Sequence, residues 1–334
     1  GMTYWYTGLQ ETIDHLRQAF GTIPIFLGGT YATLCTRHAR DNSGADRVIP
    51  GPWETGLLPR LTEAFGLDFG GQKLSPDAVP FPANDLYSGS PAAVMRLTRG
   101  CPFSCDYCAS GLLSGPFDCR SPQRFADEVE WNVRGGRREI ALYDDALLAH
   151  AGNGVIPALE EVLRRDLRCH FHAPNGLHAR YMNGRIADLF RRVGFRTVRL
   201  SFESVRGRAR ETSDGKAEPG DLVRAMEALR SAGYDRGAVE VYMLIGLPGQ
   251  RQSAIRETAR FIHSLGGTIR PAQYSPVPGT PLFEEDGERT KGLADEPLLH
   301  NSTIAPGWDF RMQRYEKIKL FVRGLNRELV GAEC

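Results

Sequence analysis

The sequence predicts an α/β protein in which a partial or full (β/α) TIM-type barrel follows an incomplete Rossmann-like segment. Two observations indicate this fold class. Between residues 92 and 300, six short apolar runs alternate with five segments of helical periodicity, as parallel strands alternate with crossover helices. Residues 2–66 show the same alternation but contain only two apolar runs, too few for a complete sheet of this kind.

The N-terminal segment, residues 2–66, is expected to begin with a helix. Expected helices cover residues 9–20, 31–40 and about 54–65, and expected strands cover residues 23–27 and 47–49. Two parallel strands leave the faces and edges of a sheet uncovered, so the segment corresponds to the back half of a domain whose front half is missing. Gly1 before Met2 is typical of a residue left by tag cleavage. Residues 67–91, rich in Gly, Pro, Asp and Ser, are expected to form a linker.

In the barrel region, residues 92–300, each of the first five apolar runs leads to a helical segment. The expected strands cover residues 93–97, 139–143, 169–172, 197–202, 239–245 and 269–274. The expected helices cover residues 121–133, 155–165, 186–193, 221–232 and 255–265. Ser121 is a good N-cap and Pro122 suits the first helical position, which fixes the start of the first helix. Residues 301–334 are expected to form a tail with a helix over 308–329.

Composition excludes several classes of function. The 334 residues include 41 basic and 40 acidic ones, so the formal net charge of +1 gives no clear nucleic-acid signal. No apolar run approaches the roughly 20 residues that span a bilayer, so we expect no membrane association and a cytoplasmic location.

Three of the seven cysteines, Cys101, Cys105 and Cys108, fall within eight residues at the end of the first expected barrel strand. An odd number of cysteines with this clustering predicts a metal site rather than a disulfide framework. Three thiolates on one loop can hold three corners of a four-iron cluster and leave one iron open for another ligand. The alternatives are three buried thiols, or a zinc site completed by Cys119, Cys169 or a histidine.

This Cys-x3-Cys-x2-Cys loop, with Tyr107 before its last cysteine, resembles the signature of the radical S-adenosylmethionine superfamily. The resemblance implies a [4Fe-4S] cluster whose open iron binds S-adenosylmethionine. It also implies that the reduced cluster cleaves this cofactor to a 5'-deoxyadenosyl radical, which abstracts hydrogen from a substrate that the sequence does not identify. A reducing partner such as a flavodoxin or ferredoxin is implied as well.

The resemblance extends along the chain in the order of the superfamily's strands. It implies cofactor contacts from Tyr107, from Asp144 and Asp145 after the second strand, from Ser201 and Glu203 at the fourth, and from Gly246, Leu247 and Pro248 after the fifth. Each motif also has a simpler interpretation. Two adjacent acids can cap a helix, alternating polar residues occur on any strand face, and Gly-x-Pro-Gly is a common turn.

His170, His172 and Asn175 lie on or after the third expected strand. The two histidines share one face of that strand because side chains alternate with a period of two. They are either a pair of hydrogen-bonded core histidines or, if they face the cavity, substrate contacts or proton donors.

Residues 22–54 resemble the second half of the cobalamin-binding domain that precedes the barrel in one subgroup of this superfamily. The resemblance is carried by Gly28-Gly29 after a strand and by the run from Gly51 to Glu54. The Asp-x-His-x-x-Gly motif of many cobalamin-binding domains is absent, and neither His15 nor His38 lies in such a context. Cobalamin binding therefore stays open beside a purely structural role for the segment.

The expected function is reductive cleavage of S-adenosylmethionine followed by a radical modification, with methyl transfer as the leading outcome if cobalamin binds. The rival is a non-catalytic iron-sulfur or zinc protein with a structural or redox-sensing role. A dinucleotide-dependent oxidoreductase is disfavoured, because no Gly-x-Gly-x-x-Gly occurs at a strand-helix turn.

Overall fold

The computed structural model divides the chain into two compact units. It describes residues 2–52, 59–63, 65–66, 75–87, 89–285, 287–290, 292–293, 295–301 and 312–330. The first unit combines residues 1–75 with segments 106–115 and 274–309, and the second comprises residues 76–105, 116–273 and 310–334. The N-terminal segment thus groups with two pieces of the expected barrel region.

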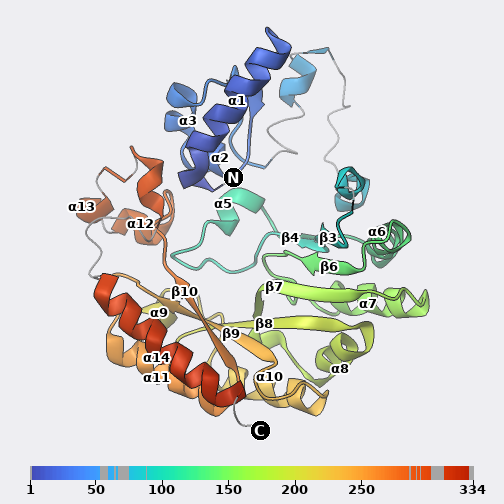
Figure 1. Cartoon of the computed structure of the whole chain (residues 1–334), viewed down its shortest axis with the longest axis vertical. Coiled ribbons are helices and arrows are strands. Elements are labelled where there is room, and N and C mark those ends of the chain that lie inside the picture. Colours follow the sequence, from blue (N-terminus) through green and yellow to red (C-terminus); the bar gives the residue numbers. More distant parts are fainter. Residues whose placement is uncertain are drawn as a thin grey trace. The chain divides into compact units, whose positions relative to one another are not determined.

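A six-stranded sheet forms the centre of the second unit (Figure 1). Its strand order is β10-β9-β8-β7-β6-β3, and all neighbouring strands are parallel. The strands are β3 (Ala92–Met95), β6 (Glu139–Leu142), β7 (His170–His178), β8 (Phe195–Glu203), β9 (Val239–Ile245) and β10 (Thr268–Gln273). The strands follow one another across the sheet in chain order, which confirms the predicted partial (β/α) barrel.

Helices cover the outer face of this curved sheet (Figure 1). They are α6 (Pro122–Arg134), α7 (Val155–Arg164), α8 (Gly184–Val193), α10 (Pro219–Ser231) and α11 (Gln252–Ser264). Between sheet and helices lies the main core, to which Phe171 of β7, Leu200 of β8 and Phe190 of α8 belong. The predicted cap is confirmed, because Ser121 Oγ accepts a hydrogen bond from Arg124 N and Pro122 occupies the first turn of α6.

Strand β7 is longer than the sequence predicts. Pro174 and Gly176 indicate the end of a strand near residue 172, because proline cannot donate to a strand ladder and glycine packs no side chain. The structure instead continues the strand to His178 through an irregularity, with the register against β8 shifting between Ala173 and Leu177. The correction moves His170 and His172 to the amino end of the strand.

A short antiparallel hairpin that the sequence does not predict closes the base of the cysteine loop. Strand β4 (Thr98–Arg99) pairs with β5 (Asp118–Cys119). Strands of two residues show no periodicity, so pattern analysis cannot detect them. The hairpin holds the two ends of the loop together.

The C-terminal helix α14 (Met312–Val330) protects one edge of the sheet. Its Asn326 side chain accepts a hydrogen bond from Ile269 N at 2.9 Å and donates one to Ile269 O at 3.0 Å. Because β10 is an edge strand, this amide occupies backbone groups that would otherwise be available for pairing with another chain.

The first unit is built around a two-stranded parallel sheet, β1 (Phe26–Leu27) and β2 (Arg47–Val48). Its further elements are η1 (Thr3–Trp5), α1 (Tyr6–Phe20), α2 (Thr30–Leu34), α3 (Thr36–Asn42), α5 (Ser110–Ser114), α12 (Pro281–Glu285), α13 (Gly287–Thr290) and η5 (Pro297–His300). The single helix expected over residues 31–40 is two helices, because Cys35 interrupts it with φ −126° and ψ 46°. Trp53, Glu54 and part of the helix expected to follow them lie outside the described residues.

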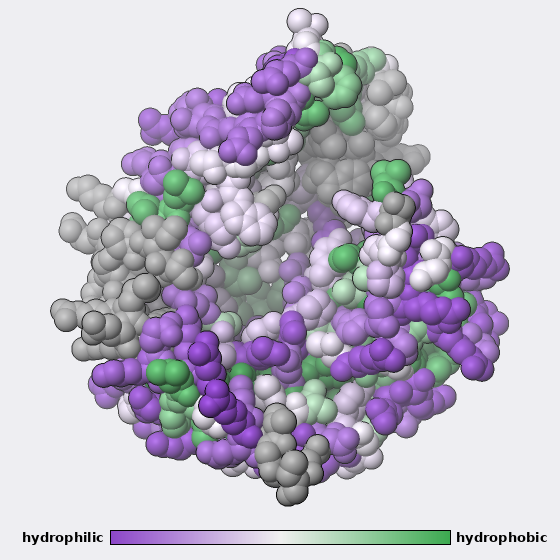
Figure 2. Space-filling view, in the orientation of Figure 1, coloured by the Kyte–Doolittle hydropathy of each residue, from purple (hydrophilic) through white to green (hydrophobic). Residues whose placement is uncertain are grey.

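Part of the expected linker wraps against α6 in the second unit, through η2 (Pro76–Ala78) and η3 (Asn84–Leu86). Asp77 accepts a hydrogen bond from Ser121 N, and the Arg124 guanidinium lies 3.8 Å from the centre of the Phe81 ring. The visible face of the molecule is mostly hydrophilic, with hydrophobic residues in small separate patches (Figure 2). Among the described residues, no helix has the length and apolar character needed to cross a membrane.

Candidate active site

The cysteine loop begins directly after the β4 strand at the carboxyl end of β3. Cys105 is buried, and its Sγ lies 3.3 Å from the carbonyl oxygen of Ser213. Cys108 and Tyr107 belong to segment 106–115 of the first unit, where Cys108 Sγ lies 3.3 Å from Ser110 Oγ. None of the six described cysteines is in a disulfide.

These residues fit an iron-sulfur cluster. Soft thiolates are the ligands that such clusters use, and three of them lie on one loop of eight residues. Among the described residues, no three His, Cys, Asp or Glu side chains gather closely enough to hold a single metal ion. An iron-sulfur cluster does not need its ligands to be that close, because each thiolate binds a separate iron.

Asp144 links the ends of the first two barrel strands. Its Oδ1 atom accepts hydrogen bonds from Leu97 N at 3.0 Å, from Thr98 Oγ1 at 2.7 Å and from Thr98 N. The other oxygen, Oδ2, is buried and has no hydrogen-bond partner among the described residues. Oδ2 is therefore the Asp144 oxygen that is open to the predicted cofactor contact, because Oδ1 already binds the backbone that leads into the cysteine loop. Asp145 is half-buried, and its cofactor role stays a prediction.

Asp144 should make stability depend on pH. Burial raises the pKa of Asp144 to about 6, although the hydrogen bonds from Thr98 and Leu97 act in the opposite direction. An unfolded aspartate has a pKa near 3.9, so the folded protein binds the proton more tightly and loses stability as the pH rises from about 4 to about 6. We expect the unfolding free energy of the metal-free protein, measured relative to Asp144→Asn, to fall by up to roughly 3 kcal/mol between pH 4 and pH 7. Urea unfolding at a series of pH values measures this difference, and a difference that does not change with pH would contradict the titration of Asp144 in this window.

Ser201 and Glu203 point toward the inner face of the sheet, opposite the helices. Val198 and Leu200 of β8 belong to the core on the helix side, so the alternating residues face the other way. Ser201 Oγ is buried without a hydrogen-bond partner among the described residues. A β-carbon at position 176 would lie 2.7 Å from this oxygen, so Gly176 keeps the space beside it open.

Glu203 ends β8 in an unusual backbone conformation. Its φ angle is +70°, and the register against β9 shifts between Ser201 and Glu203. A residue with a side chain adopts positive φ at an energetic cost that the surrounding structure must offset, and such residues gather at functional sites. The Glu203 carboxylate is buried and accepts a hydrogen bond from Lys216 Nζ at 2.9 Å.

His178 is a further candidate site residue, which the sequence does not predict. It ends β7 directly opposite Ser201, and its buried Nδ1 has no hydrogen-bond partner in the described part of the chain. Its ring lies edge-on to Phe103 of the cysteine loop, with ring centres 4.7 Å apart. Burial, with the nearby Lys216 and Arg180 charges, lowers the pKa of His178 to about 3, so its imidazole is neutral at physiological pH. The signal that could have revealed it is the alternation of β7, had the strand been followed beyond Pro174.

The loop after β9 has fewer free backbone N–H groups for a cofactor than the sequence leads us to expect. Gly246 has φ +87°, as the tight turn requires, but Gln250 Oε1 accepts hydrogen bonds from both Gly246 N at 2.8 Å and Leu247 N at 3.3 Å. These two N–H groups are occupied within the protein. Any contact of Gly246, Leu247 or Pro248 with a cofactor must therefore use carbonyl oxygens or the apolar surface.

His170 and His172 lie away from the cysteine loop. Both histidines bind the Glu139 carboxylate, through His170 Nδ1 at 2.8 Å and His172 Nε2 at 2.7 Å. His172 Nδ1 also lies 2.8 Å from Thr197 Oγ1. At about 3.3 Å per residue, these histidines lie on the order of 20 Å along β7 from His178, which contacts the loop. The interpretation as hydrogen-bonded histidines therefore fits the structure better than a role in substrate binding.

Asn175, the third residue of the predicted substrate group, contacts the end of the second barrel strand instead. Its Nδ2 donates to Tyr143 O at 2.8 Å and to Asp144 O at 3.2 Å. Asn175 thus helps to fix the turn that carries Asp144.

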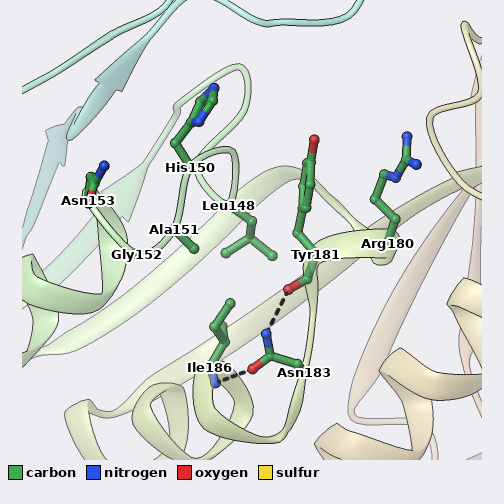
Figure 3. Close-up of a pocket in the computed structure, with 9 residues that line it drawn as sticks. All are labelled: Leu148, His150, Ala151, Gly152, Asn153, Arg180, Tyr181, Asn183 and Ile186. Atoms are coloured by element: carbon green, nitrogen blue, oxygen red, sulfur yellow. Dashed lines mark hydrogen bonds between the residues drawn. The ribbon is translucent and has the colours of Figure 1, made fainter.

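A pocket of about 480 Å³ opens between the loop after β6 and the start of α8 (Figure 3). Its lining residues are Leu148, His150, Ala151, Gly152, Asn153, Arg180, Tyr181, Asn183 and Ile186. The rings of His150 and Tyr181 and the Arg180 guanidinium extend toward the same side (Figure 3). Leu148 and Ile186 belong to the core between sheet and helices. At the other side of the pocket, the Tyr181 ring centre lies 6.2 Å from that of Phe103 in the cysteine loop, and the Arg180 guanidinium lies 5.8 Å from the same ring.

These features define the class of protein: a partial (β/α) barrel with a loop beyond its first strand whose three thiols suit an iron-sulfur cluster. The family model of the radical SAM superfamily matches residues 95–262, half of the 334-residue chain. The chain belongs to this superfamily, and membership implies a [4Fe-4S] cluster and S-adenosylmethionine as its cofactors.

Relatives of this chain carry out different reactions. The anaerobic magnesium-protoporphyrin IX monomethyl ester cyclase of Rubrivivax gelatinosus is 23% identical over 203 residues, which make up 60% of this chain but only 36% of the cyclase. A tRNA-2-methylthio-N(6)-dimethylallyladenosine synthase of Novosphingobium aromaticivorans is 24% identical over 310 residues, covering 86% of this chain and 67% of the synthase.

A solved structure shares the fold. The radical S-adenosylmethionine methyltransferase TsrM from Kitasatospora setae, with cobalamin and a [4Fe-4S] cluster bound, superposes with a TM-score of 0.67 at 17% identity. The superposition covers 86% of this chain and 62% of TsrM. This likeness supports the predicted fold.

Proposed function

We propose that this enzyme cleaves S-adenosylmethionine reductively and uses the resulting 5'-deoxyadenosyl radical to modify a substrate. The observation that carries the proposal is the loop with Cys101, Cys105 and Cys108, which begins where the first strand of the parallel sheet ends. At that edge, Ser201 and His178 present buried polar atoms that have no partner among the described residues. Because buried polar atoms in folded proteins are normally satisfied, these two atoms indicate a place for a polar ligand.

The chain's own residues would share the work of holding this cofactor. When bound to the three thiolates, the reduced cluster supplies the electron that splits the sulfonium. We assign the cofactor amino group to Asp144 Oδ2, because a buried carboxylate oxygen favours a cationic partner. We assign hydroxyl groups of the nucleoside to Ser201, His178 and Glu203, which offer neutral and anionic partners on neighbouring strands.

The remaining predicted cofactor contacts are proposed without assignment to particular atoms of the cofactor. Tyr107 and Asp145 are proposed to border the same cofactor. The adenine is proposed to pack against the turn from Gly246 to Pro248, where carbonyl oxygens rather than N–H groups are available.

Anaerobic reconstitution tests the proposal. The purified chain is incubated with iron and sulfide and reduced with dithionite, and S-adenosylmethionine is added. We expect about four irons and four sulfides per chain, visible charge-transfer absorption, and 5'-deoxyadenosine among the products. One zinc per chain with no 5'-deoxyadenosine would instead support a non-catalytic structural or redox-sensing role and overturn the proposal.

For the reaction itself we propose methyl transfer as the leading outcome if the first unit binds cobalamin. The support is the parallel β1-β2 pair and the Gly28-Gly29 turn that follows β1, where Gly29 has φ +87° and an added β-carbon would meet no atom within 4 Å. His38 Nδ1 lies 2.6 Å from the Tyr31 hydroxyl, and no cobalt ligand is assigned to this residue because it lies in no Asp-x-His-x-x-Gly motif. Absorbance of the protein fraction after gel filtration with hydroxocobalamin measures binding.

The cluster also requires a reductant. A flavodoxin or ferredoxin is proposed as the electron donor, and a cytoplasmic location is proposed with it, because iron-sulfur clusters need a reducing environment.

A further inference from the structure

Residues 213–216, here called the bracket segment, connect α9 (Arg208–Glu211) to α10 and contact the cysteine loop at two points. Asp214 Oδ2 accepts a hydrogen bond from the backbone N of Ser104 at 2.8 Å. The carbonyl oxygen of Ser213 lies 3.3 Å from Cys105 Sγ. These contacts join residues 110 and 108 positions apart in the sequence, so they tie the loop to a different part of the barrel.

The same segment also reaches the inner face of the sheet. Lys216 Nζ donates to Glu203 Oε1 at 2.9 Å, and both side chains are largely buried, with 15% and 8% of their surface exposed. In addition, the Gly215 carbonyl accepts a hydrogen bond from Arg180 Nη1 at 3.0 Å. Four residues therefore contact the cysteine loop, the end of β8 and the segment that follows β7.

The backbone of the bracket segment is held in an uncommon conformation. Asp214 and Gly215 both have positive φ angles, +50° and +60°. Aspartate tolerates this region better than most residues with side chains, but it still adopts it at a cost. Buried neighbours hold the turn in place, because Thr212 Oγ1 donates to Arg208 O and Ser213 Oγ donates to Arg210 O. A turn fixed in this way can position the groups it contacts.

We propose that Asp214 and Lys216 are positioning residues that hold the cluster loop and the Glu203 carboxylate in a fixed relation to each other. The inference rests on the proposed function, because a positioning role has an effect only if the loop holds a cluster and Glu203 belongs to a cofactor site. Asp214 acts on the backbone next to a cluster ligand, and Lys216 acts on a cofactor-site carboxylate. The two residues should therefore affect different measurements.

Asp214 is tested with Asp214→Ala and Asp214→Asn. Asparagine keeps an acceptor oxygen for Ser104 N, whereas alanine leaves this amide without its partner. In the metal-free protein, we expect hydrogen exchange of the Ser104 amide to be at least about tenfold faster in Asp214→Ala and close to wild type in Asp214→Asn. In the reconstituted protein, release of iron to a chelator should follow the same order, since partners that orient metal ligands contribute about 10- to 100-fold.

Lys216 is tested with Lys216→Met and Lys216→Arg. Methionine keeps the length of the side chain but removes the charge, so we expect S-adenosylmethionine to bind about tenfold more weakly while iron release stays at the wild-type rate. Arginine should restore part of the affinity. The electron paramagnetic resonance change that the cofactor produces in the reduced cluster provides a second readout independent of turnover.

Arg210→Ala is the matched control, because it removes the more exposed Arg210–Glu218 ion pair beside the same turn. If the Asp214 and Lys216 variants match Arg210→Ala in exchange, iron release and affinity, or change only the melting temperature, the inference is wrong. A wild-type protein that takes up no iron would instead contradict the proposed function itself, so the two failures are distinguishable.

Discussion

Replacing Cys105 with alanine is expected to reduce the iron content of the reconstituted protein from about four per chain to less than about one, and 5'-deoxyadenosine formation to below about 1% of wild type. The reason is that a cluster with three protein thiolates has no spare ligand. Cys105 is the buried member of the set, so solvent cannot readily replace it. Iron analysis and chromatography of the products measure both effects.

Cys119→Ala is the matched control for this experiment. Cys119 lies in β5 at the base of the same loop, and burial raises the pKa of its thiol to about 11, so it stays protonated and is a poor metal ligand. Its replacement should leave the iron content and product formation close to wild type. Equal losses in both variants would show that the loss comes from disruption of the loop and not from removal of a cluster ligand, and would contradict the assignment of Cys105.

Local patterns predict much of this fold because they act over short distances. The apolar period of each strand and the Ser121-Pro122 start of α6 depend on neighbouring residues, and the structure confirms both. The prediction was wrong where the strand pattern was interrupted. Pro174 and Gly176 indicated the end of a strand that instead continues through an irregularity to His178.

The site was predictable only where a single loop carries it. The cysteine loop is contiguous, so its spacing alone indicates a metal centre. By contrast, the bond from Ser104 to Asp214 joins residues 110 positions apart, and no local period encodes it. The two oxygens of Asp144 have different surroundings. One accepts hydrogen bonds from the backbone of residues 97 and 98, and the other has no partner among the described residues. This arrangement likewise depends on two strands lying side by side.

Glu203→Gln is expected to weaken binding of S-adenosylmethionine by about 10- to 100-fold while the iron content stays unchanged. Glutamine has nearly the same shape, but it replaces a charged acceptor, and hydrogen bonds to charged groups contribute about 1.5–3 kcal/mol. Isothermal titration of the reconstituted protein measures the affinity. Thermal unfolding must accompany it, because Lys216 loses its buried ionic partner in this variant.

Glu139→Gln provides the comparison that locates the site. Glu139 faces the same side of the sheet as Glu203, but it lies at the amino end of its strand and binds His170 and His172. If the cofactor binds at the carboxyl ends of the strands, this variant should retain wild-type affinity, because its carboxylate lies on the order of 20 Å from the cysteine loop. A loss in Glu139→Gln with none in Glu203→Gln would place the cofactor among the histidines and contradict the assignment of Ser201, His178 and Glu203.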